Sequence, residues 1–542
     1  MPVFVVFLMA MTLTLERAES APSKSIGLKL LGRYSSGIFG PDAAGSESLA
    51  HDPGTQRVFV VNVAQATIDV INIVNPLAPA KLFSIDLTPY GKNANSVAVR
   101  DGIVAVAVEN PVQTDPGKAV FFDADGQFLS AVTVGALPDM ITFTPNGRKV
   151  LVANEGQPSQ DYTIDPEGSV SIIDMTKGAA NLTSADVVTA DFKTFNNAVL
   201  DPSIRIFGPN ATVAQDLEPE YIAVSHDSRE AWVTLQENNA IAHLDLTQGK
   251  FTKLMGLGFK DHNQPGNALD ASDRDSAINI RNWPVKGMYL PDAIASYQYQ
   301  GQTFLITANE GDSRDYDGFS EEDRVNDLSL DPAAFPDADT LQENANLGRL
   351  TVTNTLGKNS SGKYEALYVF GARSFSIWTA DGIRVFDSGD ELEQIIADRF
   401  PDNFNADNAA NDFDTRSDNK GPEPEDVFIA RAFGRVYAFV TLERIGGVMI
   451  YDVTNPNAVS FVDYVNSRNF TVPVCDEEDD DDCEQGSVPN PAVGDLGPEI
   501  AHFITAENSP NGKPLLAVAN EISGTTTLFE VMQKTLEVVQ NP

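Results

Sequence analysis

The sequence predicts an all-β fold, a seven-bladed β-propeller with long loop insertions, and three observations support this prediction. One short unit recurs seven times: an acidic turn, a short strand, a turn rich in Pro, Gly and Asp, and an apolar strand. The strand-like runs are rich in β-branched and aromatic residues and are bounded by turn residues. Only residues 390–400 suggest a helix, of one or two turns. Seven similar sheets in sequence order suit such a propeller, although another all-β arrangement is the alternative.

The units are unevenly spaced, so we expect long loops to leave the sheets between them. They occupy residues 46–62, 95–110, 137–156, 217–238, 290–311, 422–444 and 497–521. Most are followed by a third strand that ends in Asp, such as SVSIID (169–174) and AIAHLD (240–245). Residues 25–34 precede the first unit and lack a partner, and we expect them to complete the last sheet beside residues 525–531. One domain, residues 25–534, is then followed by a tail, residues 535–542.

The composition restricts the classes of function. The chain has 542 residues, with 77 acidic against 37 Lys and Arg residues, and its net charge is −40. A surface of this sign repels phosphate backbones and anionic lipid and attracts cations, so a nucleic-acid-binding role is excluded. The 42% of hydrophobic residues indicates a folded core rather than a disordered acidic chain.

The N-terminus is predicted to be a signal peptide, residues 1–20, and the protein to be secreted. Pro2 to Leu15 is an apolar run too short to span a bilayer easily, and Ala18-Glu19-Ser20 suits signal-peptide cleavage. This run has no Lys or Arg before it, so a misassigned start or a buried strand is the alternative. No later stretch could form a membrane helix, and no hydrophobic tail suggests a C-terminal anchor.

The two cysteines and four glycosylation sequons agree with secretion. Cys475 and Cys483 flank an acidic run, and their close spacing favours a disulfide over a zinc site because no His lies nearby. The predicted N-glycosylation sites are Asn181, Asn210, Asn359 and Asn469.

Two sets of polar residues mark the ends of the repeated strands. The residues at the start of the first strand are Glu47, Asn95, Asp139, Glu220, Asp292, Glu425 and Glu499. Those at the end of the second strand are Asn62, Glu109, Glu155, Glu237, Glu310, Glu443 and Glu521. An antiparallel hairpin brings these ends to one edge, so both sets should crowd the mouth of a central channel. Crowded carboxylates raise one another's pKa or bind a cation, and oxygen ligands favour Ca²⁺ or another hard divalent metal. The alternative is that these residues only cap backbone groups.

The motif Ala-Asn-Glu-Gly occurs twice, at 153–156 and 308–311, and each copy is followed by Asp-Tyr within an acidic loop. Loops on a rigid scaffold commonly carry function, so the metal site is predicted here and along the mouth. The predicted metal ligands are Asp139, Glu155, Glu220, Asp292, Glu310, Asp312, Asp315, Glu425, Glu499 and Glu521. Arg314 would be the catalytic cation for a phosphate group if the protein were a phosphoesterase; otherwise it pairs with Asp312 or Asp315.

Other motifs carry less information. The run DEEDDDD (476–482) suits either weak cation binding or a solvated charge run. Residues 269–278 hold three Asp residues but lack the spacing of an EF-hand. The G-x-S-x-G, H-E-x-x-H and P-loop signatures are absent from the sequence, which disfavours the common hydrolase classes.

Several longer segments carry more information than the repeat pattern alone. LPDMITFTPNGRKVLVANEGQPSQDY (137–162), ITANEGDSRDY (306–316), GPEPEDV (421–427) and the region from Asp495 resemble the choice-of-anchor I family. Its members include cell-surface glycoproteins of biomineralising animals and alkaline phosphatase-like bacterial proteins. The resemblance extends from about Ile26 to Val531. It implies a secreted or surface-displayed β-propeller, with a role in calcium-rich or matrix settings or, for some microbial members, a phosphoesterase activity. The acidic loop between the cysteines and the lack of a C-terminal anchor depart from the family pattern.

Three hypotheses follow for the function. The first is a calcium-binding protein of the extracellular matrix, cell surface or biomineral, whose partners are divalent cations and mineral, glycan or matrix proteins. The second is a metal-dependent phosphoesterase. The third is a repeat scaffold that docks proteins and binds no metal.

Overall fold

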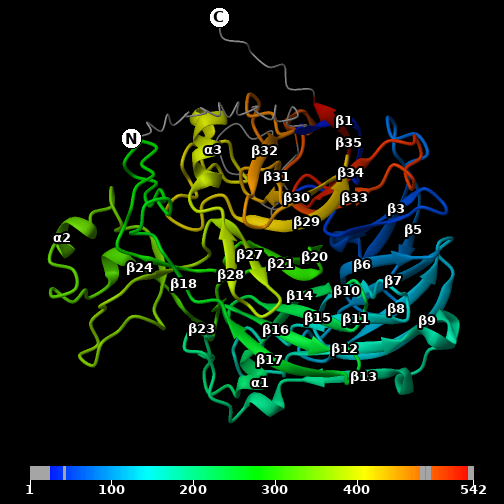
Figure 1. Cartoon of the computed structure of the whole chain (residues 1–542), viewed down its shortest axis with the longest axis horizontal. Coiled ribbons are helices and arrows are strands. Elements are labelled where there is room, and N and C mark those ends of the chain that lie inside the picture. Colours follow the sequence, from blue (N-terminus) through cyan, green and yellow to red (C-terminus); the bar gives the residue numbers. More distant parts are fainter. Residues whose placement is uncertain (1–24, 41–43, 476–482, 484–489, 535–542) are drawn as a thin grey trace, which may run out of the picture.

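The computed structural model describes residues 25–40, 44–475, 483 and 490–534. The predicted signal peptide, the acidic run 476–482 and the predicted tail lie outside these residues. The regular secondary structure of the described chain is mostly β-strands, which are arranged around a centre (Figure 1). None of its described helices is long and apolar enough to cross a bilayer.

Seven four-stranded antiparallel sheets form the body of the described chain, and we number them in chain order. Sheet 1 contains β2 (Leu49–Asp52), β3 (Arg57–Asn62), β4 (Thr67–Asn72) and β5 (Ala80–Asp86). Sheet 2 contains β6 (Ala94–Arg100), β7 (Ile103–Val108), β8 (Pro116–Asp123) and β9 (Phe128–Ala136). Sheet 3 contains β10 (Pro138–Phe143), β11 (Lys149–Asn154), β12 (Ser169–Asp174) and β13 (Val187–Asp191). Sheet 4 contains β14 (Pro219–Val224), β15 (Glu230–Leu235), β16 (Ala240–Asp245) and β17 (Lys250–Gly256).

The remaining three sheets follow the same plan. Sheet 5 contains β20 (Ile294–Tyr299), β21 (Gln302–Asn309), β27 (Ser374–Thr379) and β28 (Arg384–Asp387). Sheet 6 contains β29 (Pro424–Ala432), β30 (Arg435–Leu442), β31 (Val448–Asp452) and β32 (Ser460–Val465). Sheet 7 contains β33 (Pro498–Ile504), β34 (Leu515–Asn520), β35 (Thr525–Lys534) and β1 (Ser25–Ser35). Strand β1 pairs with β35, with Leu28 opposite Val531, so the start of the domain completes its last sheet.

The sheets form a closed ring, which is the arrangement of a β-propeller. The first strand of each sheet contacts that of the next, in the order β2, β6, β10, β14, β20, β29, β33 and back to β2. The apolar core lies between neighbouring sheets rather than at one centre, because each strand has two faces to cover. Sheets 4 and 5, for example, enclose Trp232, Tyr289 and Trp378, which are almost fully buried.

The long insertions contain structure that the repeat pattern did not predict. Between sheets 4 and 5 and within sheet 5, the chain forms a five-stranded sheet with its own core around Trp283. Its strands are β18 (Phe259–Asp261), β19 (Lys286–Met288), β26 (Tyr368–Val369), β25 (Thr351–Thr353) and β24 (Glu322–Arg324). It lies with α2 (Ala338–Leu341) on the opposite side of the molecule from sheets 2 and 3 (Figure 1). A two-stranded hairpin, β22 (Asp315–Tyr316) and β23 (Phe319–Ser320), follows sheet 5's second strand.

Short helices connect the sheets. The described α-helices besides α2 are α1 (Val213–Asp216) and α3 (Glu391–Arg399), and α3 falls where the sequence predicts a short helix. The described 3-10 turns are η1 (Val63–Gln65), η2 (Met175–Lys177), η3 (Ala179–Asn181), η4 (Ser184–Asp186), η5 (Lys193–Phe195), η6 (Val325–Asp327), η7 (Pro401–Asn403) and η8 (Pro491–Val493).

Candidate metal centre

Strand pairing brings acidic residues to one edge of each sheet. The first strand runs antiparallel to the second, so the start of one lies beside the end of the other. In sheet 3, Pro138 pairs with Asn154, and the next residue of each strand end, Asp139 and Glu155, therefore lies at this edge. The first-strand residues that occupy the position of Asp139 in the other sheets are Glu47, Asn95, Glu220, Asp292, Glu425 and Glu499. They are the residues predicted from the sequence.

The second-strand set differs from the predicted one in two sheets. Ile141 pairs with Val152 in sheet 3 and Ile222 with Val233 in sheet 4, so Gln236, not Glu237, takes the position of Glu155. In sheet 1 the corresponding residue is Val63 rather than Asn62, because Leu49 pairs with Val60. Adjacent polar residues at a strand end do not reveal the register, and a shift of one residue is enough to exchange them.

A cavity of about 340 Å³ lies on the axis of the ring, at this edge. First-strand residues of all seven sheets line it. Its carboxylates are Glu47, Asp139, Glu220, Asp292, Glu310, Asp312, Glu425, Glu443 and Glu499. The lining also includes two basic side chains, those of Lys420 and Arg444. Carboxylates thus outnumber basic side chains in the lining of the cavity.

The structure brings most of the predicted metal ligands to this region. Those that line the cavity are Asp139, Glu220, Asp292, Glu310, Asp312, Glu425 and Glu499. Glu155 is buried beside the cavity and lies within metal-binding distance of Asp139 and Glu220. Glu521 forms a similar group with Glu443 and Glu499. Asp315 is exposed on the hairpin and does not line the cavity.

The most enclosed carboxylates are Glu155, Glu218 and Glu237, which we call the Glu155 group. One oxygen from each lies within 4.8 Å of the others, a separation that a single ion can bridge. Their residues are 4%, 0% and 4% exposed. Glu155 Oε1, Glu218 Oε2 and Glu237 Oε2 are buried without a hydrogen-bond partner among the described residues. Buried charged oxygens without partners are costly, so this arrangement fits a bound cation.

Without a cation, burial and repulsion hold protons on this group. Burial, followed by repulsion from Asp139 and Glu218, raises the pKa of Glu155 well above its ordinary value. Burial raises the pKa of Glu237 to about 7 against the opposing effect of Arg314. A divalent ion would displace these protons, because opposite charge favours the ionised carboxylate.

Arg314 lies outside the cavity, in a buried ion-pair network. Its side chain is 1% exposed, and it donates hydrogen bonds to the Asp216 carboxylate and to the Asp216 carbonyl, the latter at 2.7 Å. A guanidinium nitrogen lies 2.7 Å from Glu218 Oε1. The predicted pairing with Asp312 or Asp315 is therefore wrong, and the side chain is not placed to contact a phosphate in the cavity. Asp216 is the last residue of helix α1, which is not part of the repeat, so the sequence pattern could not identify it.

The Ala-Asn-Glu-Gly motif divides into structural and site residues. Asn154 donates hydrogen bonds to Ser169 and Ser171 of the third strand, at 3.2 and 3.0 Å between its Nδ2 and their hydroxyls. Asn309 does the same to Ser374 and Ser376. The Gly of the second copy, at 311, has φ +107°, and a Cβ there would lie 2.3 Å from a backbone nitrogen. The Glu of each copy instead lies in a group of neighbouring carboxylates.

The loops after the two motifs meet. We call residues 157–168 and 312–324 the Asp-Tyr loops. Tyr162 packs edge-on against Tyr316, with ring centres 5.6 Å apart, and against Phe319 at 5.5 Å. The Gly318 backbone nitrogen donates to the Gln160 carbonyl at 2.8 Å. The contact joins sheets 3 and 5 across sheet 4, beside the Glu155 group.

A second group of carboxylates, Glu310, Glu423 and Glu443, also lies within 4.8 Å, and we call it the Glu310 group. Basic side chains fill it. Lys420 bonds Glu310 and lies 3.3 Å from Glu423, and Arg444 lies 2.9 Å from Glu423. Burial opposes ionisation of Glu423, but Arg416, Arg444 and Lys420 lower its pKa far below the usual range.

The sequence prediction missed Glu218, Glu423 and Lys420. A signal for the first two exists, because Glu-Pro-Glu occurs both at 218–220 and at 423–425, before the first strands of sheets 4 and 6. Lys420 has no such signal, since it stands in an irregular segment and reaches Glu310 from 110 residues away.

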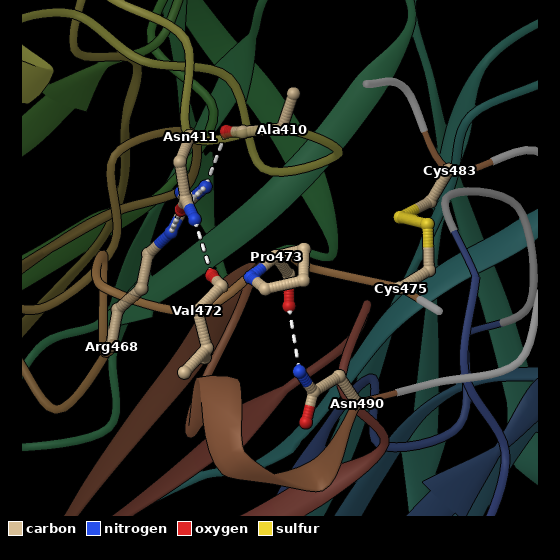
Figure 2. Close-up of a disulfide and its surroundings, with 8 residues drawn as sticks. All are labelled: Ala410, Asn411, Arg468, Val472, Pro473, Cys475, Cys483 and Asn490. Carbon is tan, nitrogen blue, oxygen red and sulfur yellow. Dashed lines mark hydrogen bonds between the residues drawn. A yellow bond between two sulfur atoms is a disulfide. The ribbon is translucent and has the colours of Figure 1, made fainter. Parts of the chain in front are cut away.

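The cysteines and sequons lie away from the cavity. Cys475 and Cys483 form a disulfide (Figure 2). The chain beside it is held by Asn490, which donates to the Pro473 carbonyl at 3.0 Å, and by Asn411, which donates to the Val472 carbonyl at 2.6 Å (Figure 2). The predicted glycosylation sites that are exposed are Asn181 and Asn210, and those that are partly exposed are Asn359 and Asn469.

The cation-free protein is expected to lose stability between pH 5 and pH 8. Burial raises the pKa of Asp139 and Asp292 to about 7 and that of Glu443 to about 8. These groups hold protons in the folded chain that the unfolded chain releases near pH 4, and each pKa unit corresponds to about 1.4 kcal/mol. Their stabilising effect is complete below pH 4 and is lost as the pH rises through their folded pKa values.

Urea unfolding in EDTA at the two pH values measures this loss. Asp292→Asn, which carries no titrating carboxyl at this position, should lose less stability than the wild type. Equal or greater wild-type stability at pH 8 would contradict the expectation.

The family model described as "Choice-of-anchor I domain" matches residues 47–456 of the chain. Gigasin-3a of Magallana gigas is 32% identical over 198 residues, which cover 35% of this chain and 67% of that protein. The mesenchyme-specific cell surface glycoprotein of Strongylocentrotus purpuratus is 28% identical over 287 residues, which cover 46% of this chain and 36% of the glycoprotein. The chain thus spans about two thirds of the first relative and about a third of the second.

Solved structures resemble the chain only distantly. Hydrazine synthase of Kuenenia stuttgartiensis has a TM-score of 0.43 at 11% identity, covering 92% of this chain and 98% of its own. Streptogramin B lyase has a TM-score of 0.44 at 11% identity, covering 94% and 98%. The β-propeller domain of Myceliophteria thermophila Cps50 (Swd1) has a TM-score of 0.42 at 9% identity, covering 93% and 100%.

Proposed function

The chain belongs to the choice-of-anchor I domain family, and from this premise we propose that it is a secreted, calcium-binding protein of the extracellular matrix, cell surface or biomineral. We also propose that its seven four-stranded sheets are the seven blades of one propeller. One relative is by name a cell surface glycoprotein, which fits an extracellular binding role. The net charge of −40 and the carboxylate-lined cavity support cations as its first partners, with mineral, glycan or matrix proteins beyond them.

The Glu155 group is the observation that carries the proposal for calcium. Three nearly fully buried carboxylates converge, and each has an oxygen without a hydrogen-bond partner among the described residues. The groups that converge are all carboxylate oxygens, the ligand type that Ca²⁺ and Mg²⁺ prefer over Zn²⁺ and Cu²⁺. Asp139 and Glu220 form a second such group with Glu155, and both of them line the cavity.

The phosphoesterase alternative has less support. It needs a cation free to contact phosphate beside the metal. Arg314 is committed to Asp216 and Glu218. Lys420 and Arg444 line the cavity, but both are paired with carboxylates of the Glu310 group.

The metal content of the purified protein tests the proposal. After exhaustive dialysis, elemental mass spectrometry should find tightly bound calcium in the wild type and less of it in Glu218→Gln. Glu109→Gln is the matched control, because Glu109 is also buried at the end of a second strand but pairs with Lys92, 3.6 Å away. It should keep the wild-type calcium content. Wild-type protein without bound metal, or equal loss in both variants, would contradict the proposal.

A further inference from the structure

Two carboxylates of the Glu155 group and two of the Glu310 group occupy equivalent positions of the repeat. Ile141 pairs with Val152 in sheet 3 and Ile294 with Thr307 in sheet 5, so Glu155 and Glu310 occupy the same place. The Glu-Pro-Glu segments of sheets 4 and 6 make a second match. Pro219 pairs with Leu235 and Pro424 with Leu442, so Glu218 matches Glu423. Each group thus joins the second strand of one sheet to the start of the next sheet.

The charges at these equivalent positions differ. By the same registers, Gln236 of sheet 4 corresponds to Glu443 of sheet 6, and Glu237 corresponds to Arg444. The guanidinium of Arg444 therefore stands at the position of Glu237, and the third carboxylate of the Glu310 group, Glu443, stands at the position of Gln236. Arg444 lies 2.9 Å from Glu423 and 3.2 Å from Glu443.

Lys420 adds a cation at the centre of the Glu310 group. Its Nζ donates to Glu310 Oε1 and lies 3.3 Å from Glu423 Oε2 and 3.5 Å from Asp312 Oδ1. Its side chain is only 10% exposed. Several carboxylates thus converge on one ammonium, as carboxylates converge on a metal ion. Attraction to these acids outweighs the cost of burial and raises the pKa of Lys420 well above its usual value.

No side chain in the described part of the protein supplies such a central cation to the Glu155 group. Arg314 approaches Glu218 through Oε1 alone, and Oε2 has no partner among the described residues. One oxygen of Glu155 and one of Glu237 are in the same condition. Carboxylates with unpartnered oxygens in the Glu155 group thus correspond to carboxylates that are paired with Lys420 or Arg444 in the Glu310 group.

We propose that the Lys420 ammonium takes, in the Glu310 group, the place that a divalent metal ion takes in the Glu155 group. The chain then neutralises one of these two acidic groups with its own lysine and leaves the other for metal. The second half of this statement rests on the proposed function, whereas the first half does not. Glu310, predicted from the sequence as a metal ligand, is on this proposal a ligand of Lys420.

Paired variants at the equivalent positions test the proposal while Lys420 itself is retained. Calcium content is measured by elemental mass spectrometry in Glu155→Gln and Glu310→Gln, and binding by calorimetry with CaCl₂ alone. Glu155→Gln should lose bound calcium, and Glu310→Gln should keep the wild-type content. Loss of calcium in Glu310→Gln would overturn the proposal, because that carboxylate would then hold a metal.

Lys420→Met provides the converse test. Removing the ammonium should let the Glu310 group bind about one more Ca²⁺ per chain, since Ca²⁺ takes carboxylate ligands at this density. Adding Glu310→Gln to Lys420→Met should abolish that extra binding, and Lys420→Arg should not show it. A folded Lys420→Met protein that binds no more calcium than the wild type would overturn the proposal. Absence of calcium in the wild type would overturn the proposed function and with it the second half of the proposal, whereas the extra ion in Lys420→Met tests the first half separately.

Discussion

Replacing Arg314 with methionine is expected to destabilise the protein by about 3–5 kcal/mol, the usual cost of removing one partner from a buried ion pair. The change leaves the carboxylates of Asp216 and Glu218 buried without their counter-charge. It also removes the hydrogen bond to the Asp216 carbonyl and the packing of the guanidinium over Phe207, 4.5 Å from the ring centre. Equilibrium unfolding in urea, with calcium present throughout, measures the effect.

Two further variants make the result specific to the ion pair. Arg229→Met is the control, because Arg229 is exposed and lies 3.9 Å from Asp227 at the surface, where ion pairs contribute little. Asp216→Asn in the Arg314→Met background should recover part of the stability, since it removes one of the two unpaired charges. An Arg314→Met protein as stable as the wild type would show that the ion pairs of Arg314 with Asp216 and Glu218 do not stabilise the fold. Lost phosphate-ester hydrolysis at unchanged stability would instead return Arg314 to a catalytic role.

Removing calcium with EDTA is expected to lower the free energy of unfolding by about 4 kcal/mol relative to protein at a free calcium concentration about a thousandfold above its dissociation constant. The stabilisation arises because the folded chain alone gathers the Glu155 group, and the ion removes the repulsion among Glu155, Glu218 and Glu237. Urea unfolding at pH 8, with calcium or with EDTA, measures the difference.

The same carboxylates must be responsible for the calcium effect. Glu218→Gln should make stability nearly independent of calcium, whereas Glu109→Gln should respond like the wild type. If EDTA changes neither protein, the carboxylates are neutralised by protons rather than by metal. If EDTA destabilises Glu218→Gln as much as the wild type, the stabilising ion is bound elsewhere in the chain.

The first-strand residues of the site were predictable because strand geometry is regular. Side chains alternate between the two faces of a strand. An acid that stands two residues before a buried position, as Asp139 does before Ile141, therefore recurs at the same edge of each sheet. The second-strand residues were less certain, since Gln236 and Glu237 are both polar and only the pairing with the first strand distinguishes them.

The groups that neutralise the acids could not be predicted from the repeat. Arg314 and Asp216 are 98 residues apart, and both stand in insertions outside the recurring unit. The five-stranded sheet was missed for a related reason. Its strands β24, β25 and β26 contain two or three residues each, too few for a recognisable alternation, and its core packs separately around Trp283.

The meeting of the Asp-Tyr loops has a mechanical consequence. Strand β1 completes sheet 7 by pairing with β35 on one side, so tension on the two ends of the domain acts first on that pairing. Sheets 3 and 5 are fastened a second time, by the contacts of Tyr162 with Tyr316 and Phe319 across sheet 4. A chain pulled from its ends should therefore release sheet 7 early, while sheets 3 to 5 hold together longest. That load-resistant part is the one that carries the Glu155 group.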